Sequence, residues 1–207
     1  MLVLGNSTEV DGYNFIKAGF GEEKDLNVIL FGSVNQCADL REVSGRLLTS
    51  MEECQKRLDA LFEPAMVSSL DIVLYSANNP YGANKGSLLK ILQKLKLEHP
   101  KIQIITLGGY VNTKRPCAYY VNKTNSTDAC ALPENVLYFE DDAKTLPMFA
   151  QFRAIESHYI DRVDLLCKNR VLQTCRTRTE EGIPVTYDGV HHSLEFAEMS
   201  GRLYEKK

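Results

Sequence analysis

The sequence lacks the concentrated positive charge that a nucleic-acid-binding surface requires. The formal net charge is −3 over 207 residues, and before the last residues no run of Lys and Arg is longer than two. Phosphate backbones are bound through clustered basic side chains, so we expect no nucleic acid among the partners. No GxGxxG or Walker-type loop follows a predicted strand either, which argues against a nucleotide-binding α/β domain.

Long apolar runs are lacking as well. No stretch approaches the roughly 20 apolar residues that a membrane-spanning helix needs. Met1 leads directly into an apolar segment without the basic region of a secretory signal peptide. The length suits one sizeable domain, so we expect a single domain over residues 1–207, cut from a longer membrane-attached protein.

Cysteine patterns for zinc are also missing. There is no CxxC, and no His stands at zinc-finger spacing from a cysteine pair, so we expect neither a metal nor another cofactor. The even number of cysteines favours disulfides in a periplasmic or otherwise extracytoplasmic compartment, with free buried thiols in a cytosolic protein as the alternative. The six disulfide candidates are Cys37, Cys54, Cys117, Cys130, Cys167 and Cys175.

Short runs rich in β-branched residues alternate with segments of helical periodicity. Strands are expected at residues 2–4, 26–31, 70–75, 102–107 and 136–139, and helices at residues 40–61, 85–97, 148–166 and 194–204. This alternation predicts a three-layer α/β/α fold of flavodoxin-like architecture, with a central parallel sheet of about five strands. The polar segment 110–133 is expected to be a long loop tethered by Cys117 and Cys130.

A serine lies where the first predicted strand ends. The strand runs into Gly5-Asn6-Ser7, which delivers Ser7 at its carboxyl end, the usual edge for functional residues in such sheets. A serine there can be a nucleophile if a base lies beside it. Capping of the following helix is the alternative, and from this segment alone it is the more common outcome.

The best candidate for the base lies near the other end of the chain. Asp188 precedes His191 by three residues, a spacing that lets a carboxylate hold one ring nitrogen and orient the other. A plain loop with a helix cap at Ser193 is the alternative. His99 is expected at a helix end, and His158 inside a helix.

Taken together, Gly5-Asn6-Ser7 and Asp188-Gly189-Val190-His191 resemble the first and last blocks of the SGNH (GDSL-type) hydrolases. The ending, with a cysteine pair before Asp-x-x-His, looks most like the extracytoplasmic SGNH domains fused to membrane acyltransferase-3 domains. The resemblance implies a Ser7–His191–Asp188 triad, an acyl-enzyme, an acyl donor from a fused or neighbouring membrane domain, and a cell-envelope glycan as acceptor. It also implies an oxyanion hole from Ser7, Gly32 and Asn78, with Asn79 as the alternate.

The sequence departs from the family pattern at three places. Asn6 replaces the usual Asp, Thr8 stands where the acyltransferase-linked domains often carry a His, and His192 replaces the usual Leu after the catalytic His. The last change leaves two histidines as candidate bases, of which the spacing from Asp188 favours His191. A carbohydrate esterase or lipase-like hydrolase, and a glycan-binding domain that has lost catalysis, stay open as alternatives.

Overall fold

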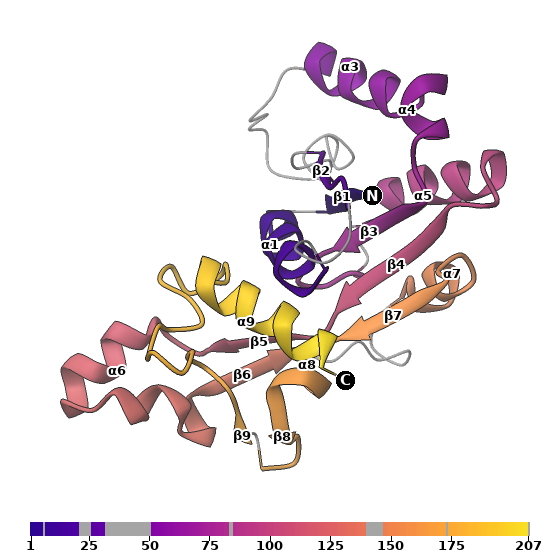
Figure 1. Cartoon of the computed structure of the whole chain (residues 1–207). Coiled ribbons are helices and arrows are strands. Elements are labelled where there is room, and N and C mark those ends of the chain that lie inside the picture. The colour runs from indigo at the N-terminus through magenta and orange to yellow at the C-terminus, as the bar shows by residue number, and fades with distance from the viewer. Residues whose placement is uncertain are drawn as a thin grey trace. The chain divides into compact units, whose positions relative to one another are not determined.

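The computed structural model describes residues 1–5, 7–20, 26–31, 51–82, 85–139, 147–172 and 174–206, which form two compact units (Figure 1). Unit 1 comprises Met1–Glu9, Asn27–Leu107 and Asp141–Tyr159. Unit 2 comprises Val10–Leu26, Gly108–Glu140 and Ile160–Lys207. Each unit has an apolar core of its own.

The elements alternate between strands and helices as the periodicity indicates. Unit 1 holds mainly β1 (Leu2–Gly5), β2 (Ile29–Leu30), α3 (Met51–Leu61), α4 (Pro64–Ser68), β3 (Ile72–Ser76), α5 (Gly86–Glu98), β4 (Gln103–Gly108) and α7 (Phe149–Arg153). Unit 2 holds mainly α1 (Glu9–Phe20), β5 (Tyr110–Thr113), α6 (Cys117–Thr124), the 3-10 helices η2 (Thr127–Ala131) and η3 (Pro133–Asn135), β6 (Val136–Phe139), α8 (Arg162–Leu166), β8 (Cys167–Asn169), β9 (Thr174–Cys175) and α9 (Leu194–Glu205). Strand β7 (His158–Asp161) has residues in both.

A five-stranded sheet with the order β2-β1-β3-β4-β7 confirms the predicted α/β/α class. The pairs β1–β2, β1–β3 and β3–β4 are parallel. Every residue of β1 is buried, as are the last four of β3, because both faces of this part of the sheet are covered. The chain passes from β1 to β2 on one side and then to β3 on the other, so the strand order reverses beside β1.

The end of β1 approaches its neighbour too closely for any side chain. Gly5 pairs with Ser76 of β3, and a Cβ added at Gly5 would overlap the Ser76 carbonyl oxygen. The Ser76 hydroxyl donates to the Thr8 carbonyl oxygen at 3.0 Å. These two contacts fix the backbone on both sides of Ser7, and they explain why this strand must end in glycine.

Two predictions about the second half of the chain were wrong. Residues 136–139 are a strand, but β6 pairs antiparallel with β5 in a separate two-stranded sheet, and the fifth strand of the central sheet is β7. Residues 148–166 are not one helix, because the chain leaves α7 and the Ser157 N–H donates to the Ile104 carbonyl oxygen of β4 at 2.7 Å. Pairing at the sheet edge therefore overrides helical periodicity, and His158 lies on a strand.

The cysteine predictions hold where the structure describes both partners. Disulfides join Cys117 to Cys130 and Cys167 to Cys175. The first links α6 to η2, so the segment 110–133 is not the loop expected but contains a strand and helices. Cys37 and the Cys54 side chain lie outside the described residues, as does the predicted helical segment 40–50.

Helices α1 and α9 touch through two glycines. A Cβ on Gly201 would lie 2.0 Å from the Phe15 carbonyl oxygen, and one on Gly19 would lie 2.8 Å from the Gly201 carbonyl oxygen. Side chains at these positions would force the two helices apart.

Among the described helices, none is long and apolar enough to cross a membrane.

We expect Gly201→Ala to destabilise the protein, because its new methyl group would meet fixed backbone. Overpacking of this kind costs about 1–3 kcal/mol, which urea unfolding can measure. Gly86→Ala is the matched control, since a Cβ there would meet only the Met148 side chain at 3.5 Å. Equal stability of the two variants would contradict the close contact between the helices.

Candidate active site

In unit 1, Ser7 and Asn78 follow the carboxyl ends of adjacent parallel strands. Gly5 of β1 is in register with Ser76 of β3. Ser7 lies two residues after Gly5, and Asn78 lies two residues after Ser76. This is the point at which the strand order reverses, the usual position of a binding crevice in open α/β sheets. The register therefore brings these two candidates to one edge of the sheet.

Ser7 is exposed in the turn between β1 and α1. Asn78 is half-buried and Asn79 is exposed in the turn after β3. Gly32, the other predicted oxyanion-hole residue, lies outside the described residues, as does Asn6.

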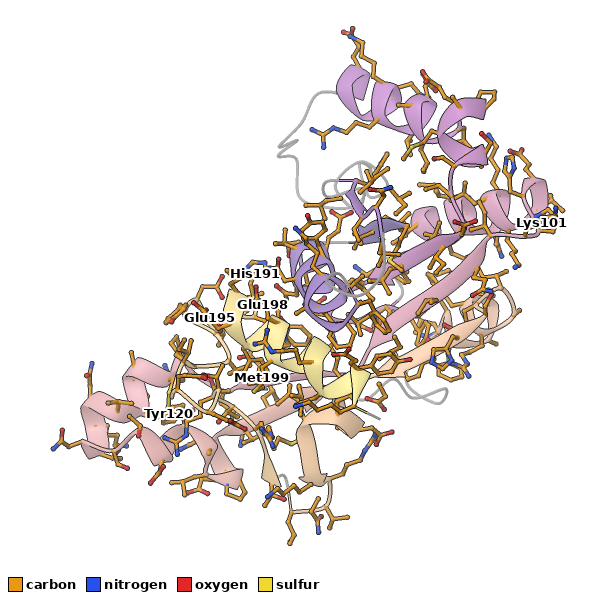
Figure 2. The ribbon with its side chains drawn as sticks, in the orientation of Figure 1. Lys101, Tyr120, His191, Glu195, Glu198 and Met199 are labelled. Carbon is orange, nitrogen blue, oxygen red and sulfur yellow. A yellow bond between two sulfur atoms is a disulfide. The ribbon has the colours of Figure 1, made fainter. Side chains whose placement is uncertain are left out.

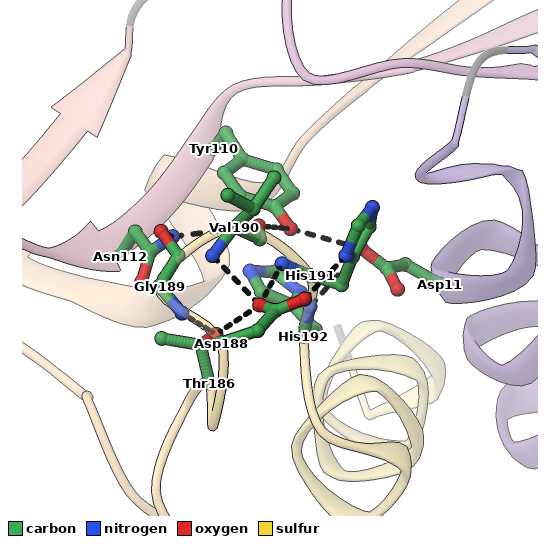
Figure 3. A network of polar contacts seen from close by, with 9 residues as sticks. All are labelled: Asp11, Tyr110, Asn112, Thr186, Asp188, Gly189, Val190, His191 and His192. Carbon is green, nitrogen blue, oxygen red and sulfur yellow. Dashed lines mark hydrogen bonds and ion pairs between the residues drawn. The ribbon is translucent and has the colours of Figure 1, made fainter. Parts of the chain in front are cut away.

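In unit 2, Asp188 organises the loop before α9. Its Oδ1 accepts hydrogen bonds from the Val190 and His191 N–H groups, both at 2.8 Å, and from the Thr186 hydroxyl at 3.0 Å (Figure 3). The Thr186 oxygen in turn accepts from the Gly189 N–H at 2.9 Å. Gly189 has a φ of 84°, so glycine permits the tight turn that aims these donors at the carboxylate.

The same carboxylate holds the His191 ring. Asp188 Oδ2 lies 2.6 Å from His191 Nδ1, which is the contact expected from their spacing. Burial alone would raise the pKa of Asp188, but the hydrogen bonds from the His191 ring and from the Val190 and His191 N–H groups outweigh it and lower that pKa. An ionised carboxylate can only accept, so Nδ1 carries the hydrogen and Nε2 of the neutral ring has the free lone pair.

The second ring nitrogen of His191 has an unusual position. Nε2 is buried, yet no atom of the described residues forms a hydrogen bond with it. His191 lies just before α9, where Glu195 and Glu198 follow (Figure 2). Within the described ranges, no group of three or more His, Cys, Asp or Glu side chains could hold a metal ion.

Strand β5 holds the backbone of this loop through two side chains. Residues two apart on a strand share a face, and Tyr110 and Asn112 both turn to the loop. Asn112 Nδ2 donates to the Gly189 carbonyl oxygen at 2.9 Å, and Tyr110 Oη lies 2.7 Å from the Val190 carbonyl oxygen (Figure 3). The loop is therefore held both by the Asp188 carboxylate, which binds its N–H groups, and by β5, which binds its carbonyl oxygens.

His192 has a packing role in the same loop. Its ring stacks on Tyr110 with centroids 4.2 Å apart, meets Phe196 edge-on, and its Nε2 lies 2.9 Å from the Val111 carbonyl oxygen. Its backbone N–H donates to Asp11 Oδ2 of α1 at 3.2 Å. Burial lowers the pKa of His192 to about 3, and the Arg162 charge adds to this. The geometry favours His191 over His192 as the candidate base.

Several residues of this network gave no signal in the sequence. The fold brings Asp11, Tyr110, Asn112 and Thr186 to the loop, and Asp11 is 181 residues away from its partner His192. Only Thr186 is local, since its hydroxyl lies two residues before Asp188 in sequence. Ser193, the helix cap in the alternative interpretation, is at the N-cap position of α9, but its hydroxyl donates to the Pro184 carbonyl oxygen at 2.7 Å.

We expect the buried, neutral His192 to make the protein less stable in acid. Its pKa is about 3 in the folded protein and about 6.5 in the unfolded chain. Between these two pKa values the unfolded chain binds one proton more than the folded protein. The stability that the neutral His192 contributes is therefore present above pH 6.5 and is lost as the pH falls, by up to about 1.4 kcal/mol per pH unit. Urea unfolding at several pH values should show a smaller acid loss for His192→Gln. The same pH slope in both proteins would contradict this role.

Comparison with known proteins adds a likeness in fold. No protein-family model matches the sequence, and no curated protein does. A solved structure of the periplasmic domain of a lipopolysaccharide acetyltransferase from Salmonella ser. Paratyphi A is similar, with a TM-score of 0.65 and 14% sequence identity. The match covers 99% of this chain and 82% of that chain. The chain therefore shares the fold of that periplasmic domain.

Proposed function

We propose that this chain is an SGNH-type serine O-acyltransferase or esterase that acts on O-acetyl groups of a cell-envelope polysaccharide or related glycan. The observation that carries the proposal is the His191 ring, with Nδ1 bound to Asp188 at 2.6 Å and a buried Nε2 that no described residue engages. This is the state in which the general base of a Ser-His-Asp triad receives a proton from its nucleophile.

The covalent chain supports Ser7 as that nucleophile. Ser7 lies four residues before Asp11, and the Asp11 carboxylate accepts a hydrogen bond from the His192 N–H, next to His191. Four residues of extended chain span at most roughly 14 Å, so connectivity limits the distance between the serine and this loop. The exposed hydroxyl of Ser7 also suits attack on an external ester.

In the proposed acylation step, His191 Nε2 takes the proton from the Ser7 hydroxyl. Ser7 Oγ forms a bond to the acyl carbon, the ester C–O bond breaks, and His191 returns the proton to the leaving alcohol. The Ser7 and Gly32 N–H groups and Asn78 are the proposed oxyanion donors. Each such donor contributes about 2.7–4 kcal/mol of barrier reduction in serine hydrolases.

The second step transfers the acyl group. His191 removes a proton from a sugar hydroxyl or from water, and the oxygen of that acceptor forms a bond to the acyl carbon. The bond between the acyl carbon and Ser7 Oγ breaks, and His191 returns the proton to Ser7 Oγ. The acyl donor would come from a fused or neighbouring membrane acyltransferase domain. A periplasmic location suits the two disulfides, because such bonds persist in oxidising compartments.

We expect Ser7→Ala to lower the rate of acetyl ester cleavage at least about 1,000-fold, because it removes the nucleophile. Asp188→Asn should lower kcat by a similar order, since the amide favours the wrong ring tautomer. The rate at which each variant cleaves an activated acetyl ester measures both effects. Ser68→Ala is the control, as an exposed serine in α4. Glycan binding without ester cleavage, together with no effect of Ser7→Ala, would instead identify a glycan-binding domain without catalysis.

Competition between acceptors separates the two enzyme classes. The wild-type protein is given an activated acetyl ester with and without added cell-envelope oligosaccharide, and acetylated sugar and free acetate are both measured. A transferase diverts acetyl groups to the sugar as its concentration rises. Release of acetate alone, unaffected by the sugar, would identify a carbohydrate esterase and contradict the transferase.

A further inference from the structure

A single hydrogen atom lies between two acceptors beside the His191 loop. Tyr110 Oη is 2.9 Å from Asp11 Oδ2 and 2.7 Å from the Val190 carbonyl oxygen (Figure 3). A tyrosine hydroxyl has one hydrogen, and a carbonyl oxygen has none to give. If Asp11 were ionised, one of these two short oxygen–oxygen contacts would hold no hydrogen and would be repulsive.

We propose that Asp11 is a neutral carboxylic acid in the folded protein and a positioning residue for His191. Its Oδ2–H donates to Tyr110 Oη, and the Tyr110 hydroxyl donates to the Val190 carbonyl oxygen. Each contact then has its own hydrogen, and the His192 N–H still finds a lone pair on Asp11 Oδ2 at 3.2 Å. The chain of donors runs from α1 through β5 to the residue before His191.

The burial of the Asp11 carboxyl agrees with this assignment. Asp11 is 4% exposed, and burial raises its pKa. The positive charge of Arg162 on α8 and the Tyr110 and His192 hydrogen bonds oppose this, but burial outweighs them. Burial also raises the pKa of Tyr110, so this residue keeps its hydrogen.

The proton on Asp11 matters for the proposed function, on which this part of the inference rests. Val190 directly precedes His191, so a Val190 carbonyl held by Tyr110 fixes the backbone from which the catalytic ring projects. A neutral Asp11 leaves Asp188 as the charged partner of the ring.

Infrared spectroscopy of the full chain tests the proton directly and needs no enzymatic activity. At neutral pH, the difference spectrum of wild type minus Asp11→Asn should contain the carbonyl band of a protonated carboxylic acid. Asp188→Asn is the matched control, because it removes an ionised carboxylate and leaves that acid band in place. Loss of a carboxylate band in Asp11→Asn, without loss of an acid band, would overturn the proposal.

The pH dependence of stability gives a second reading. A carboxyl whose pKa is raised on folding stabilises the protein below its unfolded value of 3.8, and that contribution is lost as the pH rises. Asn at this position does not titrate, so the Asp11→Asn variant lacks this pH-dependent loss of stability. The free energy of unfolding of Asp11→Asn relative to wild type should therefore increase with pH above about 4. A relative stability that falls with pH would overturn the proposal.

Activity tests the positioning role separately. Asp11→Leu removes the donor and should lower kcat for ester cleavage by about 10- to 100-fold with KM little changed, as expected when a catalytic group is misplaced. Asp11→Asn keeps a donor for Tyr110 and should recover activity relative to Asp11→Leu. If both variants lose activity equally, the neutral donor is not what positions His191. If the acid band is present but Ser7→Ala is fully active, the proton assignment stands and the proposed function fails.

Discussion

The hydrogen bond between Asp188 and His191 is the interaction on which the proposed chemistry depends. It exists because a glycine turn aims two backbone N–H groups at the Asp188 carboxylate and keeps it ionised. The ionised carboxylate then fixes the tautomer of His191 and leaves Nε2 as the basic nitrogen. Without this turn, His191 would be an ordinary loop histidine with no defined protonation pattern.

The turn is itself held by residues that take no part in the proposed proton transfer. Tyr110 and Asn112 bind two carbonyl oxygens of the loop from β5, and His192 packs between β5, α1 and α9. Because folding already fixes the geometry of this loop, little conformational entropy would be lost when the candidate base is oriented for reaction. The buried polar network therefore links the stability of unit 2 to the orientation of the candidate base.

The sequence predicts those parts that depend on local pattern. The apolar runs at β1, β3 and β4 suffice to predict strands, and the Asp188-to-His191 spacing suffices to predict the contact between these two side chains. Residues 148–166 show where local pattern misleads. The edge strand β7 has few buried residues, so its sequence lacks the alternation of a typical strand and is compatible with a helix. Asp11 and Tyr110 are 99 residues apart in sequence, so only the tertiary fold unites them.

The most direct test of the central claim is covalent labelling by a serine-directed fluorophosphonate, followed by peptide mass spectrometry of the labelled chain. If His191 activates Ser7, the wild-type protein carries one adduct on Ser7, and His191→Gln carries little or none. Absence of an adduct on Ser7 in the wild type, or equal labelling in His191→Gln, would contradict an activated serine at this position.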